Sequence, residues 1–160
     1  MHIGIKLKFW LFDHFWWLLC FLMVLTLVVL LHLKEPLSTV ATVVGMFLSL
    51  IYFLQKQKLE ELHLFRELFK EFNARYGCMN EQLARIVECE VIEVSKTERD
   101  TIIDYFNLCG EEYLYFVRGY IDPTVWNAWE NGMKAIFSVQ RVQRVWETEK
   151  LNESYYGLPL

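Results

Sequence analysis

Glycine, histidine and proline are scarce in this chain of 160 residues. The seven glycines are scattered and form no GxxxxGKS/T-type loop, which excludes a phosphate cradle of that kind. His63 is the last of four histidines, so residues 64–160 supply none to a metal site, a Glu-x-x-His di-iron site or a Ser-His-Asp triad. Three prolines and no Gly/Ser-rich stretch indicate no flexible linker. We therefore expect no metal, no cofactor and no enzymatic activity.

Basic charge is also sparse, with 16 Lys and Arg against 20 Asp and Glu. From Lys56 onward acidic side chains outnumber basic ones, and an acidic domain repels the phosphates of nucleic acids. We therefore expect no nucleic-acid partner. The four cysteines, Cys20, Cys78, Cys89 and Cys109, show no CxxC spacing. We expect them to be reduced and buried as small apolar residues.

Apolar residues, in contrast, are abundant at the N-terminal end. The run from Phe9 to His32 is almost entirely apolar, and about 20 such residues in a helix cross a bilayer. No small-residue cleavage site follows this run, so it predicts an uncleaved membrane span and not a signal peptide. Pro36 cannot continue a helix and predicts a tight turn over residues 33–38, with Ser38 or Thr39 capping the next helix.

A second, shorter apolar run predicts a second span over residues 39–54. Ala41, Gly45 and Ser49 are spaced by four and therefore lie on one helical face. In lipid, a stripe of small residues lets two helix backbones approach closely. The stripe predicts packing against the first span or, alternatively, contact between subunits.

Basic residues flank the two spans on one side only. Lys6 and Lys8 precede the first span, and Lys56, Lys58 and Arg66 follow the second. The positive-inside rule then places both termini in the cytoplasm. The predicted location is the inner (plasma) membrane, with the lipid bilayer as a partner.

Two polar residues, Asp13 and His14, lie near the start of the first span. Trp10, Trp16 and Trp17 surround them, as in the aromatic belt at a membrane interface. An interfacial position explains the pair without a function. The alternative is an intramembrane proton or ion relay, because ionisable groups inside a membrane commonly serve one.

The rest of the chain predicts a small cytoplasmic helical bundle. The predicted organisation is a transmembrane hairpin over residues 1–55 and a cytoplasmic helical domain over residues 56–160. The first cytoplasmic helix, 56–76, continues the second span without a breaker, and Gly77 predicts its left-handed end. The apolar stripe of that helix recurs at three- and four-residue steps: Leu59, Leu62, Phe65, Phe69, Phe72 and Tyr76.

Capping signals predict three further helices. Asn80 starts one, Thr97 with the acidic residues after it starts another, and Gly119 ends that second one. Asp122 as N-cap with Pro123 in the first helical position is a strong start signal. We expect the aromatic C-terminal tail to dock on the domain. The predicted ranges are 80–94, 97–118 and 123–150 for the helices and 154–158 for the tail.

One polar cluster is a candidate ligand site. Asp104, Asn107, Glu111 and Arg118 share a face of the predicted helix over 97–118, with Glu112 beside them. They could form a buried polar network or bind a ligand. The alternative is a helix surface whose carboxylates pair with Arg118 or with the start of the next helix.

Three stretches carry a resemblance: Asp104–Glu112 (DYFNLCGEE), Arg118–Trp126 (RGYIDPTVW) and Ser154–Leu158 (SYYGL). They resemble an uncharacterised group of bacterial membrane proteins, and the middle stretch is similar to the DUF4760-type domain. The resemblance covers about residues 65–158 and implies two spans followed by a helical domain, with no established activity. Some bacterial proteins of this architecture are candidate phage-defence effectors with an Arg-x4–6-His RNase motif. This chain has no histidine after His63, so that activity is not supported.

These observations predict an all-α, non-enzymatic membrane protein. Its cytoplasmic helical domain would bind a protein partner or form a homo-oligomer. The alternatives are an oligomeric membrane pore or membrane-disrupting effector in phage defence, and a ligand sensor built on Glu111, Glu112 and Arg118.

Overall fold

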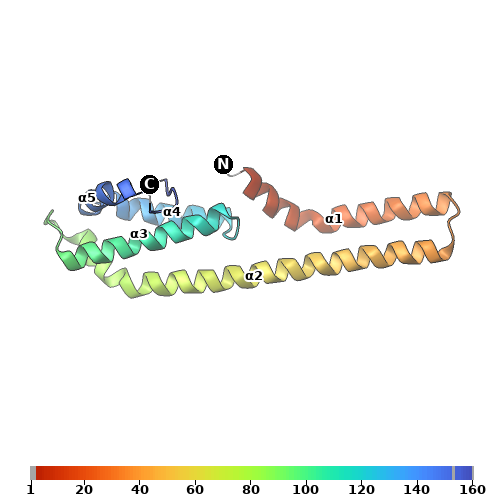
Figure 1. The fold of residues 1–160 in the computed structure, drawn as a ribbon, viewed down its shortest axis with the longest axis horizontal. Coiled ribbons are helices and arrows are strands. Elements are labelled where there is room, and N and C mark those ends of the chain that lie inside the picture. The colour runs from red at the N-terminus through yellow and green to blue at the C-terminus, as the bar shows by residue number, and fades with distance from the viewer. Residues whose placement is uncertain (1–2, 153, 160) are drawn as a thin grey trace. The chain divides into compact units, whose positions relative to one another are not determined.

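The chain is helical in the computed structural model, which describes residues 3–152 and 154–159, and the side chains of all of these except residues 3, 6, 11–13 and 152. No strand occurs within the described ranges, so the predicted all-α class is confirmed. In chain order the elements are α1 (Ile3–His32), α2 (Leu37–Glu88), α3 (Lys96–Val117), α4 (Pro123–Phe137), α5 (Gln140–Glu149) and the 3-10 helix η1 (Lys150–Asn152) (Figure 1).

The elements belong to two compact units. The N-terminal unit is Met1–Leu64 and the C-terminal unit is Phe65–Leu160. The division falls within α2, so no irregular linker separates them. The two units are described separately below.

The N-terminal unit contains two helices that are long and apolar enough to cross a membrane, His14–His32 and α2. Only 6% of the most apolar stretch of the first helix is buried, and 0% of that of the second helix. The core helix of a soluble protein would instead be mostly buried. The two predicted apolar segments are therefore present as helices whose surfaces are uncovered among the described residues.

The predicted turn between these helices is shorter than expected. α2 begins at Leu37, and the amides of Thr39 and Val40 donate to the carbonyl of Pro36 at 2.9 and 3.3 Å. Pro36 therefore stands where Ser38 or Thr39 was predicted to cap the helix. The residue just before a helix accepts the first helical hydrogen bond through its backbone carbonyl. Proline has no backbone N–H to donate, but its carbonyl accepts as well as that of any other residue.

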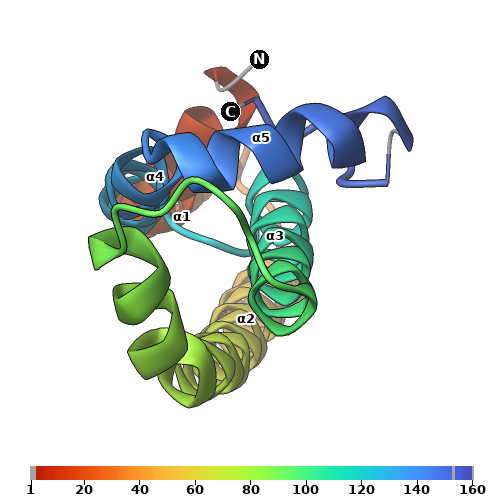
Figure 2. The same ribbon diagram turned by 90° about the vertical axis from the view of Figure 1, so that its left-hand side faces the viewer.

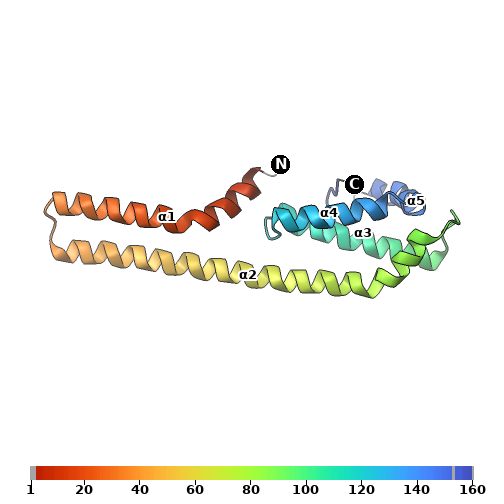
Figure 3. The ribbon, with the colours of Figure 1, turned by 180° about the vertical axis from the view of Figure 1, so that it is seen from behind.

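The predicted helix end at Gly77 and helix start at Asn80 are wrong. α2 runs through both to Glu88, although its ribbon bends before its C-terminal end (Figure 1 and Figure 3). Glycine in a helix interior costs only about 1 kcal/mol relative to alanine. Burial of Leu83 and Ile86 beyond the glycine outweighs that cost, because each buried aliphatic side chain contributes about 1.5–3 kcal/mol.

The predicted extension of this helix to Val94 is also wrong. Residues 89–95 are irregular, and their β-branched side chains disfavour a helix. Ser95, not Thr97, caps α3: the Glu98 amide donates to the Ser95 hydroxyl, and the Ser95 amide donates to the Glu98 carboxylate at 2.8 Å. This reciprocal capping box ends the irregular segment. Gly119, with φ 77°, closes α3 as predicted.

The predicted helix over 123–150 is two helices, α4 and α5. Its start is confirmed, because Asp122 accepts from the Thr124 amide at 2.7 Å. The break lies at Ser138, whose hydroxyl donates to the Ala135 carbonyl at 2.7 Å and so competes with the helical bonding of the backbone. The break lets α5 lie across α3 and α4 (Figure 2).

An aromatic cluster fills the interior of the C-terminal unit. The Phe106 ring lies 4.9 Å from that of Phe137, 5.0 Å from that of Trp146 and 5.9 Å from that of Tyr155, between centroids. Three helices and the tail thus meet at one ring. The predicted docking of the tail is confirmed, since Tyr155 and Leu158 are buried.

Replacing Gly77 with alanine is expected to raise the free energy of unfolding by about 0.5–1 kcal/mol. A Cβ at this helical position meets no atom within 4 Å. Gly119→Ala is the matched control and should lower stability by about 1 kcal/mol, because its φ of 77° is left-handed. Urea unfolding of the full chain in non-ionic detergent measures both. Equal losses in the two variants would mean that Gly77 ends a helix.

Candidate functional site

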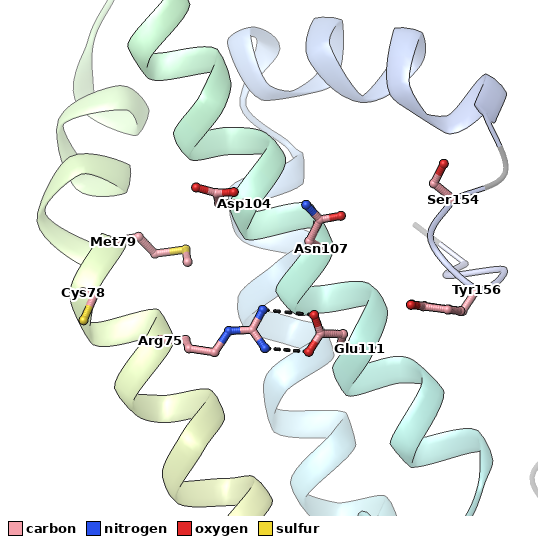
Figure 4. A pocket seen from close by; sticks show the side chains of 8 residues that line it. All are labelled: Arg75, Cys78, Met79, Asp104, Asn107, Glu111, Ser154 and Tyr156. Atoms are coloured by element: carbon pink, nitrogen blue, oxygen red, sulfur yellow. Dashed lines mark hydrogen bonds and ion pairs between the residues drawn. The ribbon is translucent and has the colours of Figure 1, made fainter.

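Three residues of the predicted cluster lie together on α3. Asp104, Asn107 and Glu111 face a cavity of about 470 Å³, called here the Glu111 cavity. Figure 4 shows Arg75 reaching from α2 across to Glu111. The other lining residues come from α2 and from the C-terminal tail: Cys78, Met79, Ser154 and Tyr156.

A bidentate ion pair closes one side of the Glu111 cavity. The two terminal guanidinium nitrogens of Arg75 donate to the two carboxylate oxygens of Glu111, at 2.5 and 3.1 Å. The hydrogen bonds to Glu111 raise the pKa of Arg75, with burial opposing them and the charges of Glu111 and Glu71 adding. Glu111 therefore pairs with Arg75, and the alternative that it pairs with Arg118 is wrong. Sequence reasoning missed Arg75 because spacing along one helix cannot identify a partner on another.

The structure does not bring Glu112 and Arg118 into this cavity. Arg118 is the exposed C-cap of α3, and its backbone amide donates to the Leu114 carbonyl at 3.1 Å. Glu112 follows Glu111 in the helix and so points about 100° away from it, into the interior. The five predicted ligand residues thus belong to three different places.

Glu112 lines a second cavity of about 190 Å³, called here the Glu112 cavity. The residue is only 8% exposed, no hydrogen bond or ion pair of its carboxyl group is found among the described residues, and its oxygens are not fully enclosed. Burial raises the pKa of Glu112 to about 8, against a lowering effect of the Arg75 charge and with a further rise from Glu111. A carboxyl group that is buried, unpartnered and next to a cavity is a candidate site by its chemistry. The sequence held a signal for it, since Glu112 is in phase with the apolar stripe of Tyr105, Leu108 and Phe116.

Beside this cavity, Tyr105 and Cys109 form a buried pair. Burial raises the pKa of both groups, and the interaction between the phenol and the thiol contributes to both shifts. Cys109 thus stays an unreactive thiol, as predicted. The prediction of burial is wrong for Cys20 and Cys78, which are exposed although all four cysteines are free.

The polar pair near the start of the first span is only partly described. The Asp13 side chain lies outside the described residues. The His14 Nδ1 atom lies 2.9 Å from the Trp10 carbonyl oxygen, and the two rings stack at 4.8 Å. These contacts hold the His14 ring against its own helix, so a relay involving the two residues stays a prediction.

The small-residue stripe is uncovered in the N-terminal unit. Ala41, Gly45 and Ser49 are all exposed, and a Cβ at Gly45 would meet no atom within 4 Å. Packing of the stripe against the first span is therefore contradicted, because an intimate helix contact would fill that space. Other residues of α2 are half-buried instead: Val40, Val43, Val44, Phe47, Ile51 and Leu54.

No protein-family model matches the chain, and no curated protein or solved structure matches it. The resemblance to two-span bacterial membrane proteins and to the DUF4760-type domain therefore rests on its three sequence stretches alone. Among the residues that the structure describes, no group of three His, Cys, Asp or Glu side chains could hold a metal ion. In the Glu111 cavity the carboxylate of Glu111 is already paired with Arg75. In the Glu112 cavity the carboxyl group of Glu112 has no such partner among the described residues.

Proposed function

We propose that the chain is an inner-membrane protein anchored by a hairpin of α1 and the apolar part of α2, with both termini in the cytoplasm. The uncovered apolar surfaces of both helices support the anchor. The short connection Leu33–Pro36 and a 3.0 Å ion pair between Lys8 and Glu61 support the hairpin, since helices joined by a short loop run antiparallel. Lys8, Lys56 and Lys58 then lie at one end, which the positive-inside rule assigns to the cytoplasm.

In this proposal the protein works through association, and the first partner is a second copy of the chain. The observation that carries it is the exposed stripe Ala41, Gly45 and Ser49 on an apolar helix. Within a bilayer, helix association depends on close van der Waals packing, which small residues permit. The C-terminal unit would then be displayed in more than one copy for a protein partner.

The hydroxyl groups of α2 favour a dry helix contact over a water-filled lumen. Thr42 and Ser49 each donate to the carbonyl four residues earlier, both at 2.9 Å. These hydroxyls therefore need no water and no polar partner. A helix face with such internal hydrogen bonds can pack against a second apolar helix without leaving a donor unsatisfied.

Catalysis is not part of the proposal. The buried nucleophile Cys109 is held as a neutral thiol because burial raises its pKa. The main exposed charges of the Glu111 cavity are matched by the Arg75–Glu111 pair. Binding explains such an arrangement more directly than proton or group transfer.

The mass of the full-length protein in lipid nanodiscs, determined by native mass spectrometry, tests self-association. We expect a dimer or a larger assembly for the wild type and a shift to monomer for Gly45→Leu, because the leucine holds the backbones apart. Met46→Leu is the matched control, since Met46 is exposed on the neighbouring face and should leave the mass unchanged.

A wild-type monomer would refute self-association and leave a different protein as the partner of the C-terminal unit. An assembly that persists in Gly45→Leu would place the interface elsewhere. A closed ring of several subunits, with ion flux through liposomes that Gly45→Leu abolishes, would favour the alternative of a pore or membrane-disrupting effector. The short second span and the polar pair Asp13 and His14 are the features that favour this alternative.

A further inference from the structure

The Glu112 cavity is built by three helices of the C-terminal unit. α2 contributes Phe72, Asn73 and Tyr76, and α3 contributes Tyr105 and Leu108 besides Glu112 itself. The lining residues of α4 include two small ones four positions apart: Ala128, Trp129, Gly132, Met133 and Ile136. Residues so spaced share a helix face. At the cavity this face of α4 therefore carries two small residues in place of large side chains.

Gly132 borders space that the protein leaves open. A Cβ built on Gly132 meets no atom within 4 Å. Gly132 and Ala128 are exposed, so this space lies at the surface of the unit, where a ligand can enter from solvent. The cavity volume of about 190 Å³ is on the scale of a small organic molecule, since a cavity of about 150 Å³ admits benzene.

The carboxyl group of Glu112 provides the polar recognition element in this space. Its oxygens are not among the buried side-chain atoms that lack a partner, so they reach the open side of the cavity, where a ligand can donate hydrogen bonds to them. The nearest cation that influences Glu112 is Arg75, and its fork is engaged with both oxygens of Glu111. The acceptor oxygens of Glu112 are therefore available to a ligand.

Aromatic rings from all three helices line the same cavity as Glu112. Tyr76 and Tyr105 have ring centroids 6.2 Å apart, and Phe72 and Trp129 have centroids 6.1 Å apart in an edge arrangement. Aromatic faces attract organic cations, and Trp and Tyr do so best. A carboxylate in a cavity lined by such rings suits an ammonium group that is partly stripped of water.

We propose that the Glu112 cavity binds the ammonium group of a small alkylamine, with Glu112 as its counter-ion and the rings of Tyr76, Tyr105 and Trp129 as its walls. The ammonium group donates hydrogen bonds to the carboxylate, and the alkyl chain occupies the space beside Gly132. The same chemistry could be presented by a free amine or by a lysine side chain of a protein partner. This inference does not depend on self-association of the membrane spans.

Binding is coupled to the protonation of Glu112. The burial-raised pKa of about 8 keeps the empty-site carboxyl group neutral at pH 7, so a cation binds with release of the carboxyl proton to solvent. Affinity should then fall about tenfold for each pH unit below that pKa. The other titratable groups near Glu112 are Tyr76, Tyr105, Cys109, Arg75 and Glu111, and α4 contributes none to the lining.

Calorimetric titration of the full-length protein in non-ionic micelles with n-butylammonium tests the site, at pH 6, 7 and 8. We expect binding that strengthens with pH, with a proton released into the buffer. Glu112→Gln should weaken it at least about tenfold and remove its pH dependence, and Gly132→Leu should abolish it by filling the cavity. Asp104→Asn is the matched control, because it neutralises an exposed carboxylate of the same helix that lines the other cavity and does not act on Glu112, and it should bind as the wild type does.

Two further probes separate the alternatives. Butanol has the same alkyl chain without the charge, and equal binding of butanol would overturn the role of Glu112 as a counter-ion. A blocked lysine amide that binds more tightly than n-butylammonium would assign the site to a lysine of a partner, and the reverse order would assign it to a free amine. Absence of binding by either amine at millimolar concentration would refute the proposal, whatever the mass of the assembly in nanodiscs.

Discussion

Arg141→Ala is expected to lower the free energy of unfolding of the C-terminal unit by about 3 kcal/mol. Arg141 is 4% exposed and donates to the carbonyls of Ile86 and Glu93, at 3.2 and 2.7 Å. It also donates to both carboxylate oxygens of Glu98 at 3.0 Å. One guanidinium therefore joins the end of α2, the irregular segment after it and the cap of α3. Its removal takes this donor from two carbonyl groups and removes the charge partner of the Glu98 carboxylate, which keeps only its hydrogen bonds from Ser95.

The loss should appear as faster native-state hydrogen exchange in α3 and α5 of the full chain in detergent. Arg144→Ala is the matched control, since Arg144 is exposed on the same helix and its loss should change stability by less than about 0.5 kcal/mol. Arg141→Lys should recover little, because one ammonium cannot replace a planar fork. If Arg141→Ala were as stable as Arg144→Ala, the contacts of Arg141 would carry no net stabilisation.

Glu112→Gln is expected to stabilise the C-terminal unit at pH 8 by about 2–4 kcal/mol and to change it little at pH 5. Burial raises the folded-state pKa of Glu112 to about 8, above its ordinary value of 4.5 in the unfolded chain. The unfolded chain therefore loses this proton first as pH rises. Between about pH 5 and pH 8 the wild type should lose about 1.4 kcal/mol per pH unit through this group, and the glutamine variant should not.

Urea unfolding of both proteins in the same micelles, at several pH values, measures this difference. Asp104→Asn serves as the control and should keep the pH slope of the wild type, because Asp104 is not among the groups that shift the pKa of Glu112. The other shifted carboxyl group, Glu98, does not interfere, because hydrogen bonds from Ser95 and then Arg141 lower its pKa and it titrates below this range. Parallel pH profiles for wild type and Glu112→Gln would show that Glu112 is ionised in the folded protein at neutral pH.

Local signals in the sequence predicted the parts of the fold that local chemistry determines. Asp122 and Pro123 start α4, and Gly119 ends α3, because a cap or a left-handed residue acts on the backbone within one turn. The helical state of the two apolar runs follows equally from composition. In these cases the residues that decide the structure are neighbours along the chain.

Other features depend on residues that are distant in sequence, and the sequence alone misled at these points. Gly77 looked like a helix end, but burial of Leu83 and Ile86 in the core carries α2 past it. The break at Ser138 has no glycine or proline, and the apolar pattern continues through it. The candidate site shows the same limit, since the ion-pair partner of Glu111 is Arg75 on α2, which is distant in sequence.

The docked tail affects when the C-terminal unit can fold during synthesis. Tyr155 packs on Phe106 and Trp146, and Gly110 lets its backbone come close, since a Cβ there would lie 3.4 Å from the Tyr155 Cα. Chains emerge from the ribosome N-terminal end first, at about 5–20 residues per second. The interior around Phe106 therefore cannot close until the tail that contains Tyr155 has been made. The two apolar helices leave the ribosome well before that, and they are available for membrane insertion while the C-terminal unit is still unfolded.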